Sequence, residues 1–208
     1  MTQPSGVTAK ADDVLAFWFG QQRDGFASDA HRKLWFAGGA AFDAEIREQF
    51  IGTVAAVTSG DIDGWLTQPR NRLAYILVCD QFPRHLFRGT GEAFNFDPQA
   101  LDAARSGIAT GMDHELTFDE RAFFYMPLEH SEVLLDQHAC VGLFSLLRDR
   151  TPEGFRHLTG ASLKYAHQHR DIVLRFGRFP HRNALLQRPS TPQELKFLEA
   201  GSTFGQSA

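Results

Sequence analysis

The sequence predicts an all-α fold, a single domain built from stacked antiparallel helical hairpins. The first observation is composition, because 24 alanines and 21 leucines far outnumber 8 valines and 6 isoleucines, which favours helix over sheet. The second is a series of helix start and stop signals along the chain. The third is that no segment alternates long enough to predict a strand, while short connections between helices favour hairpins.

In the first half of the chain, apolar spacing predicts the helices. The apolar series from Phe42 to Val57 recurs every three or four residues, and Gly60 follows it as a stop signal. A second series, from Leu73 to Leu77, has the same helical spacing. Both series therefore predict helices with one buried face.

In the second half, capping signals predict the helices. Three dipeptides place an N-cap residue before proline at the first helical position: Asp97-Pro98, Thr151-Pro152 and Thr191-Pro192. Thr117 and Glu120 have capping-box spacing, as do Thr191 and Glu194, and Gly111 and Gly201 are stop signals. Together the signals predict helices near residues 12–19, 31–36, 40–58, 70–81, 98–109, 118–125, 128–148, 152–176 and 192–200.

The domain organisation follows from the same pattern. No Ser/Gly-rich linker divides the chain, so residues 11–201 are expected to form one domain, with flexible ends at 1–10 and 202–208.

Composition excludes several classes of protein. The net charge of −4 is unlike that of a dedicated nucleic-acid binder. The start, MTQPSGVTAK, lacks the apolar core of a secretory signal, and no apolar stretch approaches the roughly 20 residues that span a bilayer. Cys79 and Cys140 do not make a disulfide framework. We therefore expect a cytoplasmic protein without a nucleic-acid or membrane partner.

The first segment with candidate chemistry is DQFPRHLFRG, residues 80–89. Asp80 falls on the same helical stripe as the core-facing leucines, at a helix end where the dipole disfavours a negative charge. Pro83 is expected to end this helix. Asp80 therefore needs a cation, and Arg84 or Arg88 is placed to form an internal ion pair with it.

The second segment is YMPLEHSE, residues 125–132. Met126-Pro127 is expected to end one helix and start the next, which places Glu129 in a new first turn. On that helix Glu129, Glu132 and Asp136 would share one stripe. His130 is either a satisfied core histidine or a functional group.

The third segment is RFGRFPHRNALLQR, residues 175–188, with four arginines and no acid. Arginine grips carboxylate or phosphate bidentately, so the segment is either a partner for buried carboxylates or an anion site. The flanking phenylalanines would anchor it to the core.

The sequence lacks the usual motifs of metal sites, phosphate-binding loops and serine hydrolases. It contains no His-Glu-x-x-His, no paired Cys-x-x-Cys, no phosphate-binding glycine loop and no Gly-x-Ser-x-Gly elbow. Glu129 is followed three residues later by Glu132, whereas a di-iron helix needs histidine there. We therefore expect neither a metal nor a cofactor.

Three stretches carry a family resemblance: CDQFPRHLFRGTGEAF (79–94), FYMPLEHSE (124–132) and RFGRFPHRNALL (175–186). With them the sequence resembles the uncharacterised bacterial family catalogued as domain of unknown function 924. The match runs from VLAFWFG (14–20) to STPQELKFL (190–198). This resemblance implies a helical fold similar to tetratricopeptide-like hairpins, and it implies no activity.

Three hypotheses follow if the segments converge in space. The leading one is a polar cleft that binds a small anionic ligand or an acidic partner segment, lined by Asp80, Arg84, Arg88, Glu129, His130, Glu132, Arg175, Arg178, His181, Arg182 and Asn183. The second is a small acid–base hydrolase, with catalytic candidates Glu129, His130, Glu132 and His181 and with Arg178 stabilising negative charge. The third is a purely structural charge network.

Overall fold

The computed structural model describes residues 8–199, which form an all-α fold with one small β-hairpin. The α-helices are α1 (Ala11–Phe19), α2 (Asp29–Ala37), α3 (Gly39–Ser59), α4 (Pro69–Ile76), α5 (Phe82–Leu86), α6 (Asp97–Ala109), α7 (Phe118–Glu129), α8 (Leu134–Arg150), α9 (Arg156–Phe176) and α10 (Pro192–Leu198). The short helical turns are η1 (Asp63–Thr67), η2 (Leu77–Gln81), η3 (Gly91–Phe94), η4 (Met112–Glu115), η5 (Glu153–Phe155) and η6 (Pro180–Arg182). The predicted flexible ends lie outside the described residues, except for residues 8–10.

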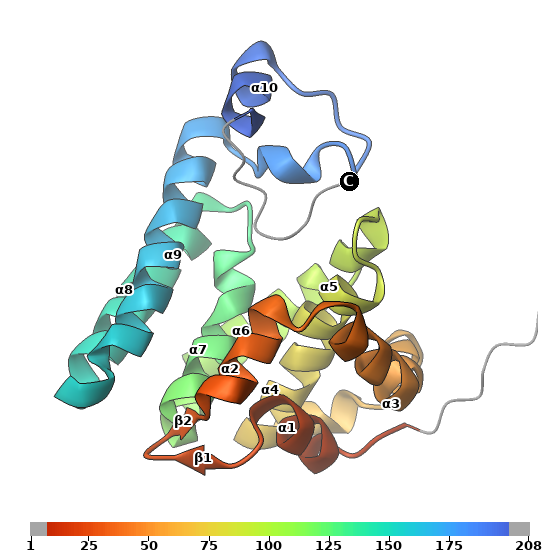
Figure 1. Cartoon of the computed structure of the whole chain (residues 1–208), viewed down its shortest axis with the longest axis vertical. Helices are drawn as coiled ribbons and strands as arrows, with labels where there is room; N and C mark the ends of the chain where they lie inside the picture. Colours follow the sequence, from red (N-terminus) through yellow and green to blue (C-terminus); the bar gives the residue numbers. More distant parts are fainter. Residues whose placement is uncertain (1–7, 200–208) are drawn as a thin grey trace, which may run out of the picture.

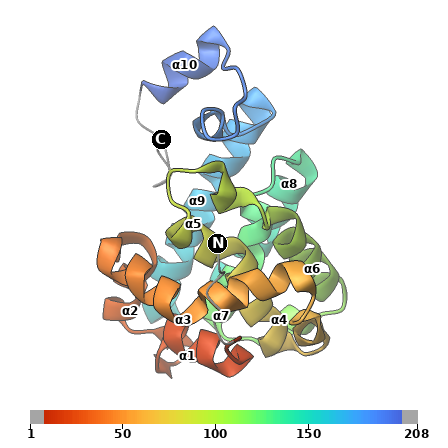
Figure 2. The same cartoon turned by 90° about the vertical axis from the view of Figure 1, so that its right-hand side faces the viewer.

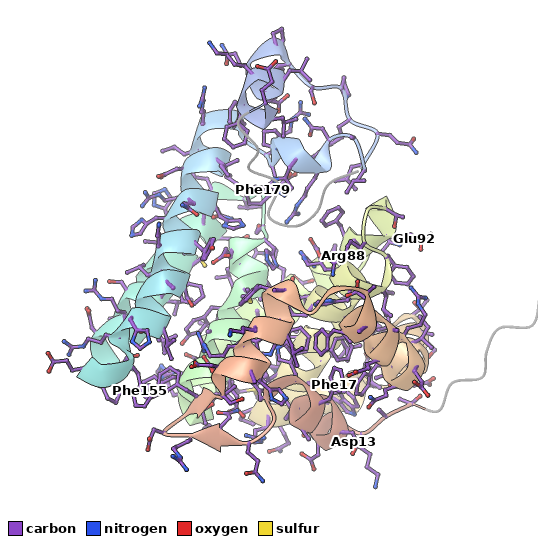
Figure 3. The ribbon with its side chains drawn as sticks, viewed as in Figure 1. Asp13, Phe17, Arg88, Glu92, Phe155 and Phe179 are labelled. Carbon is purple, nitrogen blue, oxygen red and sulfur yellow. The ribbon has the colours of Figure 1, made fainter. Side chains whose placement is uncertain are left out.

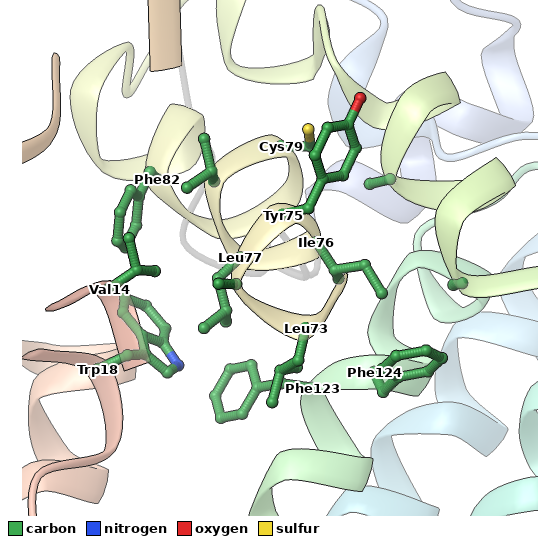
Figure 4. Close-up of a cluster of buried hydrophobic side chains, with 14 of the residues drawn as sticks. Val14, Trp18, Leu73, Tyr75, Ile76, Leu77, Cys79, Phe82, Phe123 and Phe124 are labelled. Carbon is green, nitrogen blue, oxygen red and sulfur yellow. The ribbon is translucent and has the colours of Figure 1, made fainter. Parts of the chain in front are cut away.

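The hydrophobic core surrounds α4. Figure 4 shows this helix between Val14 and Trp18 of α1 on one side and Phe123 and Phe124 of α7 on the other. Leu73 is fully buried in that core, as its helical spacing predicts. Because α4 packs against elements from both halves of the chain, the described residues form one domain.

The C-terminal helices pack as antiparallel hairpins. Figure 1 shows α7, α8 and α9 side by side, with α8 running opposite to both neighbours. Figure 2 shows α10 at the far end of α9, away from α1 to α4. There a second, smaller cluster contains Ile172, Val173 and Phe179. The chain thus has a large core and a separate, much smaller apolar cluster.

The helix that carries Asp80 does not end at Pro83, so that prediction is wrong. The chain stays helical from α4 through η2, a π-helical turn, into α5. The N–H of Phe82 bonds to the carbonyl of Leu77, five residues back. Such a widened turn accommodates the ring of Pro83 without breaking the helix.

The break predicted at Met126-Pro127 is also misplaced. Helix α7 continues through a buried Pro127 to Glu129, and the chain leaves the helix only after that residue. Burial of this stretch in the core outweighs the missing N–H of the proline. Glu129 therefore lies in the last turn of α7, and the expected stripe with Glu132 and Asp136 does not form.

The end of α7 is fixed by one side chain of α8. The Nε2 group of Gln137, which is fully buried, donates to the carbonyls of Leu128, Glu129 and Ser131 at 3.2, 2.7 and 2.6 Å. These bonds satisfy carbonyls that a helix C-terminus leaves without a partner. Gln137 thereby positions the turn that carries His130.

Smaller differences have local causes. The sequence predicts no strand, yet β1 (Gln22–Arg23) and β2 (Phe26–Ala27) pair antiparallel around Asp24 and Gly25, which both have positive φ as a two-residue hairpin turn requires. The predicted helix 152–176 opens with η5 before α9 begins. Asp97 is the first residue of α6 and not its N-cap. Residue 200 and the stop signal at Gly201 lie outside the described part.

Between residues 8 and 199, no helix combines the length and the apolar character needed to cross a bilayer.

Candidate functional site

A cavity of about 660 Å³ lies between α2, α5, α7, α9 and η6. Helix α7 lines it with Asp119, Ala122, Phe123, Met126, Glu129 and His130, and helix α9 with Leu158, Ala161, Ser162, Tyr165 and His169. The spacing of three and four residues means that each helix presents one face to the cavity. Figure 3 labels Arg88, which lines the cavity, and Phe179, which lies just before η6.

The three charged segments of the sequence meet at this cavity. Arg84 comes from the first segment, Glu129 and His130 from the second, and His181 and Arg182 from the third. All five side chains line the same space, although up to 98 positions separate them in the sequence.

Asp80 and His130 form a buried pair beneath the cavity. His130 Nδ1 lies 2.7 Å from Asp80 Oδ1, and Asp80 is only 1% exposed. Burial alone would raise the pKa of Asp80, but Arg84, His130 and a hydrogen bond from Gln81 lower it below its usual range. The ionised carboxylate holds the Nδ1–H tautomer of His130, so Nε2 is the basic atom of the neutral ring.

Glu129 is an acid in an apolar and electronegative setting. It is 4% exposed, and its Oε1 lies 3.5 Å from His169 Nδ1. Burial, followed by the charge of Asp80, raises the pKa of Glu129 to about 8. At pH 7 this side chain is therefore mostly a neutral acid with a proton that it can donate.

The histidines of the cavity are neutral bases. Burial lowers the pKa of His169 to about 3, and a hydrogen bond from its Nδ1 to the Tyr165 carbonyl, 2.9 Å long, sets its tautomer. Burial and the nearby Arg182 lower the pKa of His181 to about 3. Burial also lowers the pKa of His130. Near neutral pH, the fixed positive charge at the site therefore comes from arginine.

Arg84 and Arg182 share one carboxylate, that of Asp97. Arg84 bonds to it through both terminal nitrogens at 3.0 and 3.2 Å, and Arg182 Nη1 lies 3.3 Å from its Oδ2. Arg84 also donates to the Asp80 carbonyl and lies 3.4 Å from its carboxylate. Both guanidinium groups lie over the ring of Phe94. Arg84 is thus the partner that the sequence expects for Asp80.

The contacts of Arg182 do not fully offset the cost of burying its charge. It is 7% exposed, and burial lowers its pKa to about 10, so it remains charged at neutral pH. Its guanidinium stacks on Phe179 at 4.6 Å from the ring centroid. Its Nε–H has no acceptor among residues 8–199. A buried donor of this kind favours binding of an acceptor.

Several predicted site residues have other places in the structure. Arg88 reaches the cavity rim but pairs with Asp43 at 3.0 Å. Arg178 lies outside the cavity and bonds Glu194 at 2.6 and 2.8 Å. Arg175 is exposed and stacks on its neighbour Phe176.

Glu132 and Asn183 also lie outside the cavity lining. The carboxylate of Glu132 accepts from Arg188 at 2.7 and 2.9 Å and from the backbone N–H of Phe179. Asn183 is fully enclosed and accepts from Arg188 Nε. These contacts shape the chain around η6, so both residues support the position of Arg182 indirectly.

Sequence reasoning missed four residues at the site. His85 lines the cavity and pairs with Asp43 at 2.7 Å, and His169 faces Glu129. Asp97 bridges the two arginines although its position before proline suggested a helix cap. The available signal was His169 itself, a polar residue in the apolar stripe of a long helix. The contacts of Asp43 and Asp97 carry no local signal.

Among residues 8–199, no three His, Cys, Asp or Glu side chains are grouped so that they could hold a metal ion.

Comparison with known proteins supports the family and the fold. The family model described as bacterial protein of unknown function (DUF924) matches residues 14–202. No curated protein matches the chain. A solved structure of a protein of unknown function from Agrobacterium tumefaciens is 38% identical, covers 92% of this chain and 97% of its own, and has a TM-score of 0.77. The chain therefore belongs to the DUF924 family of bacterial proteins of unknown function.

Proposed function

We propose that the cavity binds a small organic anion, and that Arg182 and Arg84 hold its charged group. The observation that carries this proposal is Arg182, a buried cation that lines the cavity and whose Nε–H has no acceptor among the described residues. A carboxylate or phosphate oxygen supplies such an acceptor, and the planar guanidinium suits its geometry.

The charge balance supports an anion of low charge. Arg84 and Arg182 face the carboxylates of Asp80 and Asp97, so the two arginines are already neutralised. Glu129 adds no full negative charge at pH 7, because burial raises its pKa to about 8. Its proton can instead form a hydrogen bond to the ligand, and the neutral histidines can take up a proton on binding. A ligand with one negative charge is therefore favoured over a multiply charged one.

The size of the cavity supports a small molecule. Its volume of about 660 Å³ lies within the range of roughly 300–1,000 Å³ that small-molecule sites occupy. Aromatic and aliphatic walls with a few convergent polar groups are also typical of such sites.

The test is calorimetric titration with acetate, benzoate and inorganic phosphate at pH 7. For whichever of these anions binds the wild type, we expect Arg182→Ala to weaken the binding at least tenfold, which corresponds to about 1.4 kcal/mol, because the charged group loses its bidentate partner. Arg175→Ala is the matched control, since it removes an exposed arginine outside the cavity. Equal affinity in both variants and the wild type would refute the proposal.

The Asp80–His130 pair favours a second function, acid–base catalysis in the same cavity. His130 Nε2 would accept a proton from water while the protonated Glu129 donates one to the leaving group. Arg182 would stabilise the developing negative charge in place of Arg178, which lies outside the cavity. A screen of ester and amide substrates tests this function, and Glu129→Gln should abolish any turnover that is found. Turnover that survives this change would remove Glu129 from the mechanism.

A further inference from the structure

One end of the cavity holds Arg84 and Arg182, and the other, the apolar end, is walled by apolar side chains except for the ion pair between Arg32 and Asp119. Helices α7 and α9 run in the same direction along it. At their N-terminal ends, Phe26 stacks on Phe118, the first residue of α7, and on Phe155, the N-cap of α9, with ring centroids 5.2 and 4.7 Å apart. At their other ends His130 and His169 lie 6.2 Å apart. Both cavity-facing stripes can therefore be followed from the same end.

Both stripes change character in the same direction. On α7, Asp119 in the first turn is followed by the apolar residues Ala122, Phe123 and Met126, and then by Glu129 and His130. On α9 the apolar residues Leu158 and Ala161 come before the polar end at His169. At a rise of 1.5 Å per residue, the distance from Leu158 to His169 is roughly 16 Å. The site is thus elongated: Arg84, Arg182 and Glu129 gather at one end, and the other end has a single ion pair, Arg32 with Asp119, among apolar side chains.

Helix α2 completes the apolar end. The ring of Trp35 lies 4.7 Å from that of Phe123, and both line the cavity. Phe36 also lines it and is 73% exposed, so its ring is accessible to a ligand in the cavity. The small side chains of Ala122 and Ala161 leave space between these walls.

We infer that the bound anion carries an unbranched apolar tail, as a straight-chain aliphatic carboxylate does. This inference rests on the proposed function, because the carboxylate occupies the arginine end. The tail lies along the α7 and α9 stripes toward Trp35 and Ala161 and removes their apolar surface from water. Its contribution grows with length, by about three- to fourfold in affinity for each CH₂ that is buried.

The first experiment is a titration series from acetate through butanoate and hexanoate to octanoate, below micelle-forming concentrations. Binding is followed by calorimetry and by the fluorescence of Trp35, compared with a Trp35→Phe variant. We expect the dissociation constant to fall by tenfold or more for each two-carbon step until the cavity is filled. A dissociation constant independent of chain length would overturn the inference.

The second experiment blocks the apolar end with Ala161→Phe, a change at an exposed position of α9. Ala139→Phe is the matched control, because Ala139 is exposed on α8 and does not line the cavity. We expect Ala161→Phe to weaken octanoate at least tenfold and to leave acetate unchanged. Unchanged octanoate affinity, with thermal melting confirming that the variant is folded, would contradict the placement of the tail.

Arg182→Ala separates the inference from the proposed function. If both are right, this variant weakens acetate and octanoate by the same factor. If octanoate binding depends on Ala161 but not on Arg182, the tail site stands and the anion site fails. If all carboxylates depend on Arg182 but none on length or on Ala161, the anion site stands and the inference fails.

Discussion

Two segments with the same composition form two walls at the charged end of the cavity. Residues 82–85 (Phe-Pro-Arg-His) begin α5, whereas residues 179–182 (Phe-Pro-His-Arg) follow α9 and lead into η6, and each segment contributes an arginine and a histidine to the lining. The two phenylalanines are both fully buried. The two segments differ in what they are buried against.

The first segment is part of the main core, whereas the second depends on the small C-terminal cluster. Phe82 packs against Phe50 at 4.9 Å and Trp18 at 5.7 Å within the main core. Phe179 shares its cluster with only Ile172 and Val173 among buried residues, and its nearest rings belong to His169 and His181. Similar sequence therefore gives one firmly supported wall and one weakly supported wall.

The largest effect is expected from a change in the firmly supported wall, residues 82–85. Phe82→Ala removes a ring that is fully enclosed by other aromatic side chains, so we expect a loss of about 3–5 kcal/mol in the free energy of unfolding. Chemical denaturation measures it. A loss below about 1 kcal/mol would mean that the two walls have similar support.

The next effect tests the charge that holds Arg84. In Asp80→Ala, the guanidinium of Arg84, which is 12% exposed, loses the buried carboxylate beside it. We expect the free energy of unfolding to fall by about 3–5 kcal/mol. Asp97→Ala should cost less, because the Asp97 side chain is 20% exposed and solvent can take its place. A melting temperature that hardly moves in Asp80→Ala would argue against a structural role of the pair.

Glu129, which lies between the two walls, gives a pH-dependent effect. Its pKa rises from 4.5 to about 8 on folding, so the native state keeps a proton that the unfolded chain releases between these values. Its contribution to stability is present below pH 4.5 and is lost as pH rises toward 8, by roughly 3 kcal/mol at pH 7. We expect Glu129→Gln to flatten this decline in denaturation curves from pH 5 to pH 8. An identical slope in the wild type and the variant would show that Glu129 is ionised in the native state.

The smallest effect concerns the weak wall. Phe179→Ala should cost about 2 kcal/mol or less in global unfolding, because the C-terminal cluster can open without the main core. Hydrogen exchange should show faster exchange in η6 and α10 and no change in α4. Faster exchange in α4 as well would show that the two clusters unfold together.

Local sequence signals predicted much of the fold. The capping boxes at Thr117 and Thr191 are present, and α3 spans the predicted region and ends at Gly60. These signals succeed because caps and apolar periodicity involve residues three or four apart. The two breaks at proline were misplaced because packing in the core, and a widened turn at η2, overrode the local cost of the missing N–H.

For the candidate site, the sequence identified the charged residues better than their partners. It predicted that Asp80 pairs with Arg84 or Arg88, and Arg84 is the residue that pairs with it. It did not separate Arg182, which faces the cavity, from Arg178, which pairs with Glu194. Both arginines lie in the same basic segment, and only the turn at η6 decides which way each one faces.

By itself, the sequence determined the helical class, the caps and the buried position of Asp80, because each depends on neighbours along one helix. The tertiary structure alone decided that Asp97 joins Arg84 to Arg182, that Asp43 takes Arg88, and that His169 faces Glu129. These contacts join residues that are 13 to 85 positions apart, or helices whose order in the chain does not fix which faces meet. Side chains so far apart come together only once the whole core has packed.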